Sequence, residues 1–128
     1  MPKINIKSID HIVITCSDIE KTIAFYTFTL GMKVHCFGNN RYALRFGDQK
    51  INLHQAGKEL EPKAKLPTPG SVDICFITEL PITEVKEYLE SSGINILVGP
   101  VEKAGALGKI DSIYIHDPDK NLIEISNY

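Results

Sequence analysis

The chain has 128 residues, of which 43% are hydrophobic and 23% are charged, and its formal net charge is −2. This length and composition fit one globular domain with a substantial core and exclude a disordered chain. Charges of both signs are interleaved without a basic cluster, which argues against a nucleic-acid partner. No apolar run could span a membrane and the first ten residues lack signal-peptide features, so we expect a cytoplasmic protein with no membrane partner.

The three cysteines also favour a cytoplasmic protein. Their odd number and the absence of a C-x-x-C pair argue against a disulfide framework or a zinc knuckle. Each lies in or beside a predicted strand, so we expect packing thiols in a reducing compartment.

The first half of the chain predicts four strands and one helix. Residues 9–15 alternate and are rich in β-branched side chains, which is typical of a strand. A helix should begin at the N-cap Asp18 and end at Gly31. Three more strands are predicted at 32–37, 42–46 and 50–55, the last two joined by a turn at Gly47 and Asp48.

The second half repeats this order after a proline-rich loop at 57–71. It predicts a helix from Pro81 to Gly93 and strands at 72–78, 94–99, 112–116 and 122–126. The segment "AGALG" at 104–108 is either a mobile flap or a connecting loop. In the last turn, Asn121 is expected to have a positive φ.

Spacing supports an internal repeat. His11 and Asp73 each precede a stop glycine by 20 residues, and His54 and Glu124 each follow the start of a hairpin by 8 residues. The second copy carries extra residues, which we place in the glycine-bearing segment. The sequence therefore predicts an α+β fold in one domain, 1–128. Two tandem βαβββ units, about 8–56 and 72–128, would form a curved mixed sheet around a cavity.

Strand alternation gives each unit an aliphatic face and a face with one ionisable group per strand. The ionisable groups on four equivalent strands are His11, His54, Asp73 and Glu124. By the repeat, His11 corresponds to Asp73 and His54 to Glu124. If the units share a cavity, these side chains converge on a divalent ion such as Fe, Mn, Ni, Co or Zn. The alternative is a set of hydrogen-bonded structural histidines and solvated carboxylates.

The segments "DHIVITCSDIEKTIAFYTFTLGM" and "DPDKNLIEISNY" resemble the vicinal oxygen chelate superfamily of glyoxalases, bleomycin resistance proteins and dioxygenases. The middle of the chain resembles the branch with glyoxalase domain-containing protein five and its bacterial relatives. The resemblance implies metal ligands at His11, His54 and Glu124, with Asp73 as a fourth candidate where relatives often have histidine. It also implies a homodimer, with the cavity formed within one chain or across the interface.

The same resemblance implies a metal-dependent lyase, isomerase or transferase of glyoxalase type that acts on a small oxygen-bearing substrate. Glu124 would be the catalytic proton shuttle, and Arg45 and Tyr114 are candidate substrate-binding residues. His35 and His116 are expected to be structural or exposed. Two alternatives remain, a metal-dependent dioxygenase, which Asp73 disfavours, and a metal-free binding or resistance protein.

Overall fold

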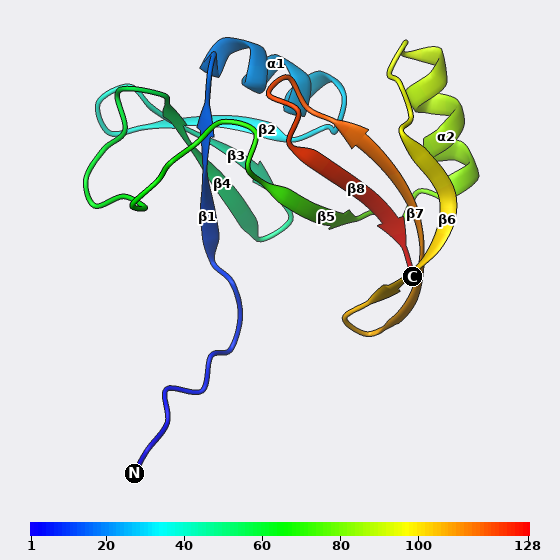
Figure 1. The fold of residues 1–128 in the computed structure, drawn as a ribbon, viewed down its shortest axis with the longest axis horizontal. Coiled ribbons are helices and arrows are strands. Elements are labelled where there is room, and N and C mark those ends of the chain that lie inside the picture. The colour runs from blue at the N-terminus through cyan, green and yellow to red at the C-terminus, as the bar shows by residue number, and fades with distance from the viewer.

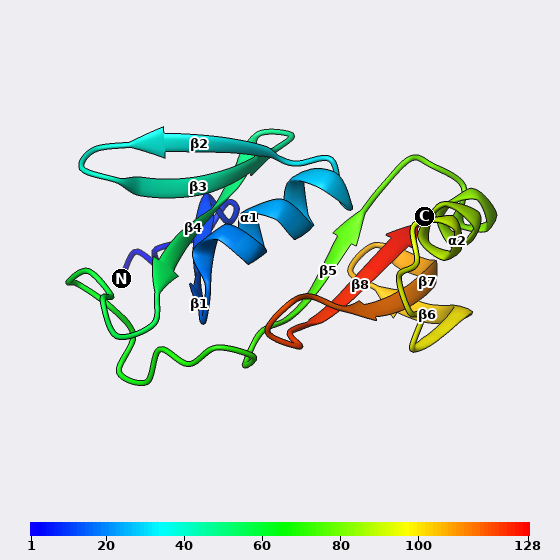
Figure 2. The same cartoon turned by 90° about the horizontal axis from the view of Figure 1, so that it is seen from above.

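The computed structural model describes residues 1–128, which form two four-stranded mixed sheets with one helix each (Figures 1 and 2). The first sheet has the order β1-β4-β3-β2, with β1 parallel to β4 and the other pairs antiparallel. Its elements are β1 (His11–Cys16), α1 (Ile19–Phe28), β2 (Lys33–Phe37), β3 (Arg41–Phe46) and β4 (Gln49–Gln55).

The second sheet repeats this topology in the order β5-β8-β7-β6, with β5 parallel to β8. It follows the irregular segment 56–72. Its elements are β5 (Asp73–Ile77), α2 (Ile82–Ser91), β6 (Val98–Gly105), β7 (Gly108–His116) and β8 (Leu122–Asn127). The predicted α+β fold with two βαβββ units is confirmed.

Local sequence signals explain where the helices begin and end. The Asp18 carboxylate accepts a hydrogen bond from the Lys21 N–H at 3.2 Å and caps α1. Each helix is followed by a glycine with positive φ, Gly31 at +68° and Gly93 at +75°, a conformation that side chains other than glycine adopt at a cost.

The glycine-bearing segment is neither a flap nor a separate loop. Its residues pair in register across the β6–β7 hairpin, from Val101 opposite Ser112 to Gly105 opposite Gly108. The extra residues of the second copy thus lengthen this hairpin. The strand predicted at 94–99 begins later in the structure, because its pairing with β7 starts only at Val98.

The prediction for Asn121 is wrong, because the positive φ belongs to Lys120, at +63°. Asn121 is fully buried, and its side-chain amide donates to the Asp117 carboxylate at 2.8 Å. In this turn Lys120 takes the left-handed conformation and the Asn121 side chain points inward. There the Asn121 Oδ1 also accepts a hydrogen bond from the Val72 N–H at 2.9 Å.

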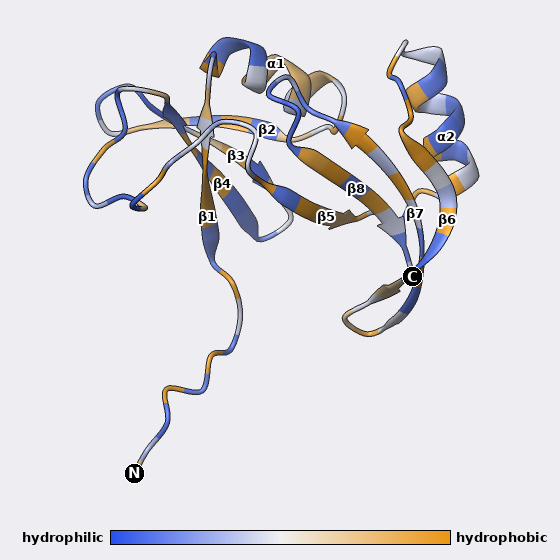
Figure 3. Cartoon of the chain, in the orientation of Figure 1, coloured by the Kyte–Doolittle hydropathy of each residue, from blue (hydrophilic) through white to orange (hydrophobic).

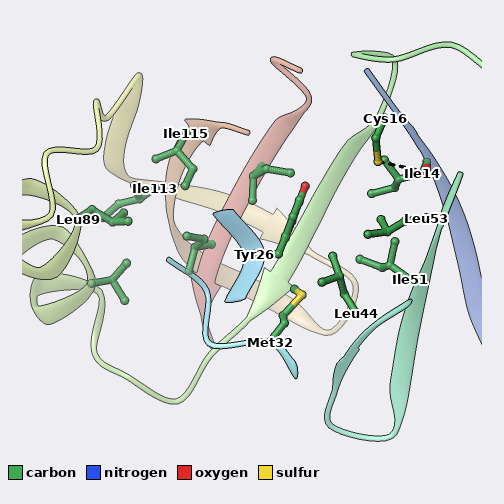
Figure 4. Packing of buried hydrophobic residues seen from close by; sticks show 13 residues of the cluster. Ile14, Cys16, Tyr26, Met32, Leu44, Ile51, Leu53, Leu89, Ile113 and Ile115 are labelled. Carbon is green, nitrogen blue, oxygen red and sulfur yellow. Dashed lines mark hydrogen bonds between the residues drawn. The ribbon is translucent and has the colours of Figure 1, made fainter. Parts of the chain in front are cut away.

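One hydrophobic core joins the two units. Tyr26 from α1 lies between the side chains of the first sheet and those of the second (Figure 4). Around it pack aliphatic residues from both sheets and α2, with Leu44, Ile51, Leu89, Ile113 and Ile123 all at most 1% exposed.

The Tyr26 hydroxyl donates to the buried Asp117 carboxylate at 2.8 Å, linking α1 to the β7–β8 turn. Burial and the negative charge of Asp117 raise the pKa of Tyr26 far above its usual range. The tyrosine therefore remains protonated and acts as a permanent donor across the two units.

Tyr26→Phe is expected to lower the free energy of unfolding by about 1.5–3 kcal/mol, because a buried hydrogen bond to a charged carboxylate is lost. Urea unfolding followed by circular dichroism measures this. Tyr42→Phe, a ring packed beside the core without a recorded side-chain hydrogen bond, is the control. A loss no larger in Tyr26→Phe than in the control would contradict this role for the hydroxyl.

The cysteines do not all pack as predicted. Cys16 is fully buried, but Cys36 and Cys75 are exposed, because they lie on strand positions that neither helix covers. Burial raises the pKa of the Cys16 thiol to about 11. Neither helix has the length and hydrophobicity needed to cross a membrane.

Residues 1–10 run away from both sheets as an extended segment (Figures 1 and 3). Four of its hydrophobic side chains are largely exposed: Met1, Ile4, Ile6 and Ile9. Exposed hydrophobic side chains contribute no burial free energy to a monomer, and covering them in an interface would be favourable.

Candidate metal and substrate site

Each sheet has one face covered by its helix and the core, and an opposite face, which we call the open face. In the first sheet, Ile14 and Leu53 are buried in the core. Alternation then places His11 and His54 on the open face, as predicted. Glu124 lies on the open face of the second sheet, between the core residues Ile123 and Ile125.

His54 lies near the C-terminal end of β4 and is only 9% exposed. It lines a cavity of about 580 Å³ between the open face and residues 62–72. Its neighbour on the same face, Asn52, is buried and its side-chain oxygen has no hydrogen-bond partner. A buried polar atom without a partner next to an imidazole is consistent with a site for a polar ligand or ion.

His11 begins β1, and its side chain is 42% exposed. Its Nδ1 lies 2.7 Å from the Asp10 carboxylate, and this hydrogen bond and the charge of His11 lower the pKa of Asp10. A carboxylate on one ring nitrogen is the arrangement that orients a histidine so that the other nitrogen can bind a metal.

Glu124 belongs to a compact polar cluster on the second sheet. Ser112 donates to its Oε2 at 2.6 Å, Ser126 lies 2.7 Å from Ser112, and the Cys75 sulfur lies 3.3 Å from Ser126. Both serines are fully buried. The serine network thus holds one carboxylate oxygen in a fixed position.

The register places Tyr114 and Cys75 on either side of Glu124, and all three line a cavity of about 370 Å³. Burial, followed by the hydrogen bond to Glu124, raises the pKa of Tyr114. Partial desolvation of its sulfur, on an otherwise exposed residue, also raises the pKa of Cys75. Both groups therefore remain protonated near neutral pH, beside the carboxylate.

Asp73 does not occupy the position that the repeat assigned to it. His11 lies four residues before Thr15, which pairs with His54, whereas Asp73 lies two residues before Cys75, which pairs with Glu124. The strand registers of the two copies thus differ by two residues, which keeps Asp73 on the open face but not equivalent to His11. The connection between β5 and α2 is longer than that between β1 and α1, and it compensates for the shift. The spacing from Asp73 to Gly93 therefore equals that from His11 to Gly31 although the registers differ.

One chain does not bring the predicted ligands together. No group of three or more His, Cys, Asp or Glu side chains is placed to hold a metal ion. His54 and Glu124 line separate cavities. A third cavity, of about 770 Å³, is mainly apolar, lies between the two units, and is lined by none of the four candidates.

Sequence reasoning missed Asn52, Ser112 and Ser126. All three alternate with core aliphatic residues on the strands that carry His54 or Glu124 or on the neighbouring β7. Small polar residues at such positions are a usable signal, because they share a face with a candidate ligand. Arg45 and Tyr114 lie on different sheets and do not meet in one chain.

Residues 8–125 match the Glyoxalase/Bleomycin resistance protein/Dioxygenase superfamily, and the chain belongs to this family. Members of this superfamily commonly use divalent metals and often form dimers.

Two curated relatives are similar over nearly the whole chain. Glyoxalase domain-containing protein RDO1 of Mycosarcoma maydis is 55% identical over 126 residues, which cover 98% of this chain and 71% of that protein. Virulence protein STM3117 of Salmonella typhimurium is 58% identical over 123 residues, covering 96% and 85%.

Solved structures confirm the fold. The crystal structure of STM3117 superposes with a TM-score of 0.95, covering 96% of this chain and 98% of that chain. A structure from the mobile metagenome of V. Pseudocholerae is 51% identical, with a TM-score of 0.96 and 98% of both chains covered. The names of these relatives give neither a substrate nor a metal.

Ser112→Ala tests the serine network. Loss of the donor to Glu124 is expected to weaken divalent-ion binding about 10–100-fold, the usual effect of removing a partner that orients a metal ligand. Competition with a chelating dye measures the affinity, and thermal unfolding shows whether the variant is folded. Ser91→Ala, on the exposed surface of α2, should bind as the wild type does. Equal affinities in the two variants would contradict the orienting role of Ser112.

Proposed function

We propose that the protein is a divalent-metal-dependent enzyme of glyoxalase type, a lyase, isomerase or transferase acting on a small oxygen-bearing molecule. Its metal ligands are His11 and His54 of one copy and Glu124 of a second copy. The observation that carries this proposal is the placement of His54 on β4 and Glu124 on β8. These are the equivalent strands of the two repeated units, and each residue faces its own open-face cavity.

The donor set fits a divalent transition metal, because two imidazoles and a carboxylate are ligands that Fe, Mn, Ni, Co and Zn accept. The polar surroundings fit as well, with a partnerless buried oxygen on Asn52 beside His54 and an oriented carboxylate at Glu124. Asp73 lies on the open face beside Glu124 and is a weaker candidate, since its register differs from that of His11.

A second copy supplies what a single chain lacks. The exposed N-terminal hydrophobic residues and the free edges of β1 and β5 are features that association would cover. A twofold dimer would give two equivalent sites, each with the histidines of one copy and the glutamate of the other. We therefore infer a homodimer.

When bound, the metal would act as a Lewis acid on neighbouring substrate oxygens. The side chains of the protein would transfer the proton and bind the substrate. Ser112 fixes Oε2 of Glu124, so the other oxygen can take a proton from substrate carbon and return it. Tyr114, protonated beside Glu124, can donate a hydrogen bond to a substrate oxygen, and Arg45 can attract a negative charge on the substrate.

Metal titration tests the proposal. Protein purified without chelator, or loaded with Mn²⁺, Ni²⁺, Co²⁺, Zn²⁺ or anaerobic Fe²⁺, should bind one ion per chain. Failure to bind any of them would leave a metal-free binding protein as the better description. Oxygen consumption with Fe²⁺ and catechols would instead favour a dioxygenase.

A further inference from the structure

The open face of the first sheet is positively charged along one row. The register places Lys33 opposite Arg45, Arg45 opposite Lys50, and Lys50 opposite His11, so four basic side chains lie side by side across four adjacent strands. We call these residues the basic row. Like charges placed directly opposite each other on neighbouring strands destabilise a sheet.

The sheet itself offers these cations no counter-charge. None of its four strands contains Asp or Glu. Asp10, just before β1, is fully exposed and is held by His11. The second sheet differs, since its open face carries Asp73 and Glu124.

Two cationic side chains contact the Phe37 ring on this face. The Lys50 ammonium and the Arg41 guanidinium each lie 4.6 Å from the centre of the Phe37 ring. His35 stacks on the same ring at 5.8 Å, with planes 9° apart. Cation–π contacts hold side chains in place without neutralising them, so their charges stay available to a ligand.

This cationic surface adjoins the proposed metal ligands. Tyr42 pairs with Leu53, and the next residues outward on the two antiparallel strands are Arg41 and His54, both on the open face. The other end of the surface reaches His11 through Lys50. A ligand held by the cations would therefore lie alongside both histidines.

From this arrangement we propose that the substrate is a small organic oxyanion, bound through a carboxylate or phosphate group by the basic row and Arg41. The inference rests on the proposed function, because it names the substrate class of the same site. Arg45 is the central member, since its guanidinium can bind an oxyanion through two parallel hydrogen bonds while Lys33 and Lys50 add charge on either side.

Anion binding to the metal-free 128-residue chain tests this independently of the metal. Succinate, inorganic phosphate and the neutral succinamide are titrated while backbone amide NMR shifts of residues 33–54 are followed. Succinate or phosphate should bind, and which of the two binds more tightly identifies the favoured group. Succinamide should bind at least about tenfold more weakly than succinate, because it lacks the charge.

Arg45→Gln should weaken anion binding about tenfold or more, whereas Lys21→Gln, on the exposed surface of α1, should leave it unchanged. The melting temperature of Arg45→Gln should stay the same or rise, because the substitution removes like-charge repulsion, whereas a structural arginine would make it fall. The inference is overturned if neither anion binds, if succinamide binds as well as succinate, or if Arg45→Gln breaks the dimer without affecting anion affinity. Metal uptake without anion binding refutes the inference alone, and anion binding without metal uptake refutes the proposed enzyme alone.

Discussion

Replacing His54 with alanine is expected to abolish stoichiometric metal uptake while the protein stays folded. His54 is the most buried of the candidate ligands and faces a cavity on the open face, so its loss removes a donor that no neighbouring imidazole replaces. Divalent-ion affinity should fall by more than about 100-fold, beyond the effect of removing a supporting residue. Isothermal titration gives the affinity, and circular dichroism gives the fold.

His116→Ala is the matched control. His116 is exposed at the end of β7, pairs with Leu122, and lines neither the cavity of His54 nor that of Glu124. It should bind metal as the wild type does. Wild-type affinity in His54→Ala would show that His54 is a structural histidine.

Glu124→Gln is expected to have the second large effect. Glutamine keeps the shape and can still accept from Ser112, but it removes the negative charge that binds a cation and the basic oxygen that accepts a proton. Metal affinity should drop about 100-fold, and proton transfer from substrate should be lost, a step that such groups accelerate about 10²–10⁴-fold.

Glu102→Gln makes the same chemical change at a position on β6 where the side chain is 63% exposed. It should leave metal binding unchanged. If both variants bind equally, the effect at position 124 is not specific and Glu124 is not a ligand. Thermal unfolding excludes a general loss of structure, because the serines around Glu124 can keep their hydrogen bonds to the amide oxygen.

The repeated pattern of strand, helix and stop glycine was enough to predict the architecture. Alternation of aliphatic and polar residues also placed His54 and Glu124 on open faces, because a strand exposes every second side chain to the same side. Both depend on local periodicity, which is present in the sequence itself.

Features that depend on contacts between distant segments were harder to predict. Besides its longer β6–β7 hairpin, the second copy has a longer connection between β5 and α2. The count from Asp73 to Gly93 could not reveal this connection, so the two-residue register shift of β5 was invisible. The glycines at 105 and 108 suggested flexibility, but they lie in the paired strands of a hairpin, where backbone hydrogen bonds decide the structure. Asn121 was placed by its propensity for turns, whereas its buried bond to Asp117 decides its orientation.

The sequence could name candidate ligands, but it could not predict how they would assemble. Periodicity says which face a side chain takes, and it says nothing about how two sheets, or two copies, approach each other. His54 and Glu124 lie on equivalent strands and still line separate cavities in one chain. Whether they meet therefore depends on association between copies, which one sequence does not encode in any local pattern.

Mixing two inactive variants tests the central claim most directly, namely that one metal site is built from two copies. His54→Ala and Glu124→Gln are co-expressed in equal amounts, so that about half of the dimers contain one chain of each. If sites lie between copies, each mixed dimer has one site with both substitutions and one intact site. High-affinity metal binding should then return to about a quarter of all sites. Recovery of none, with mixed dimers shown by mass spectrometry, would contradict the account.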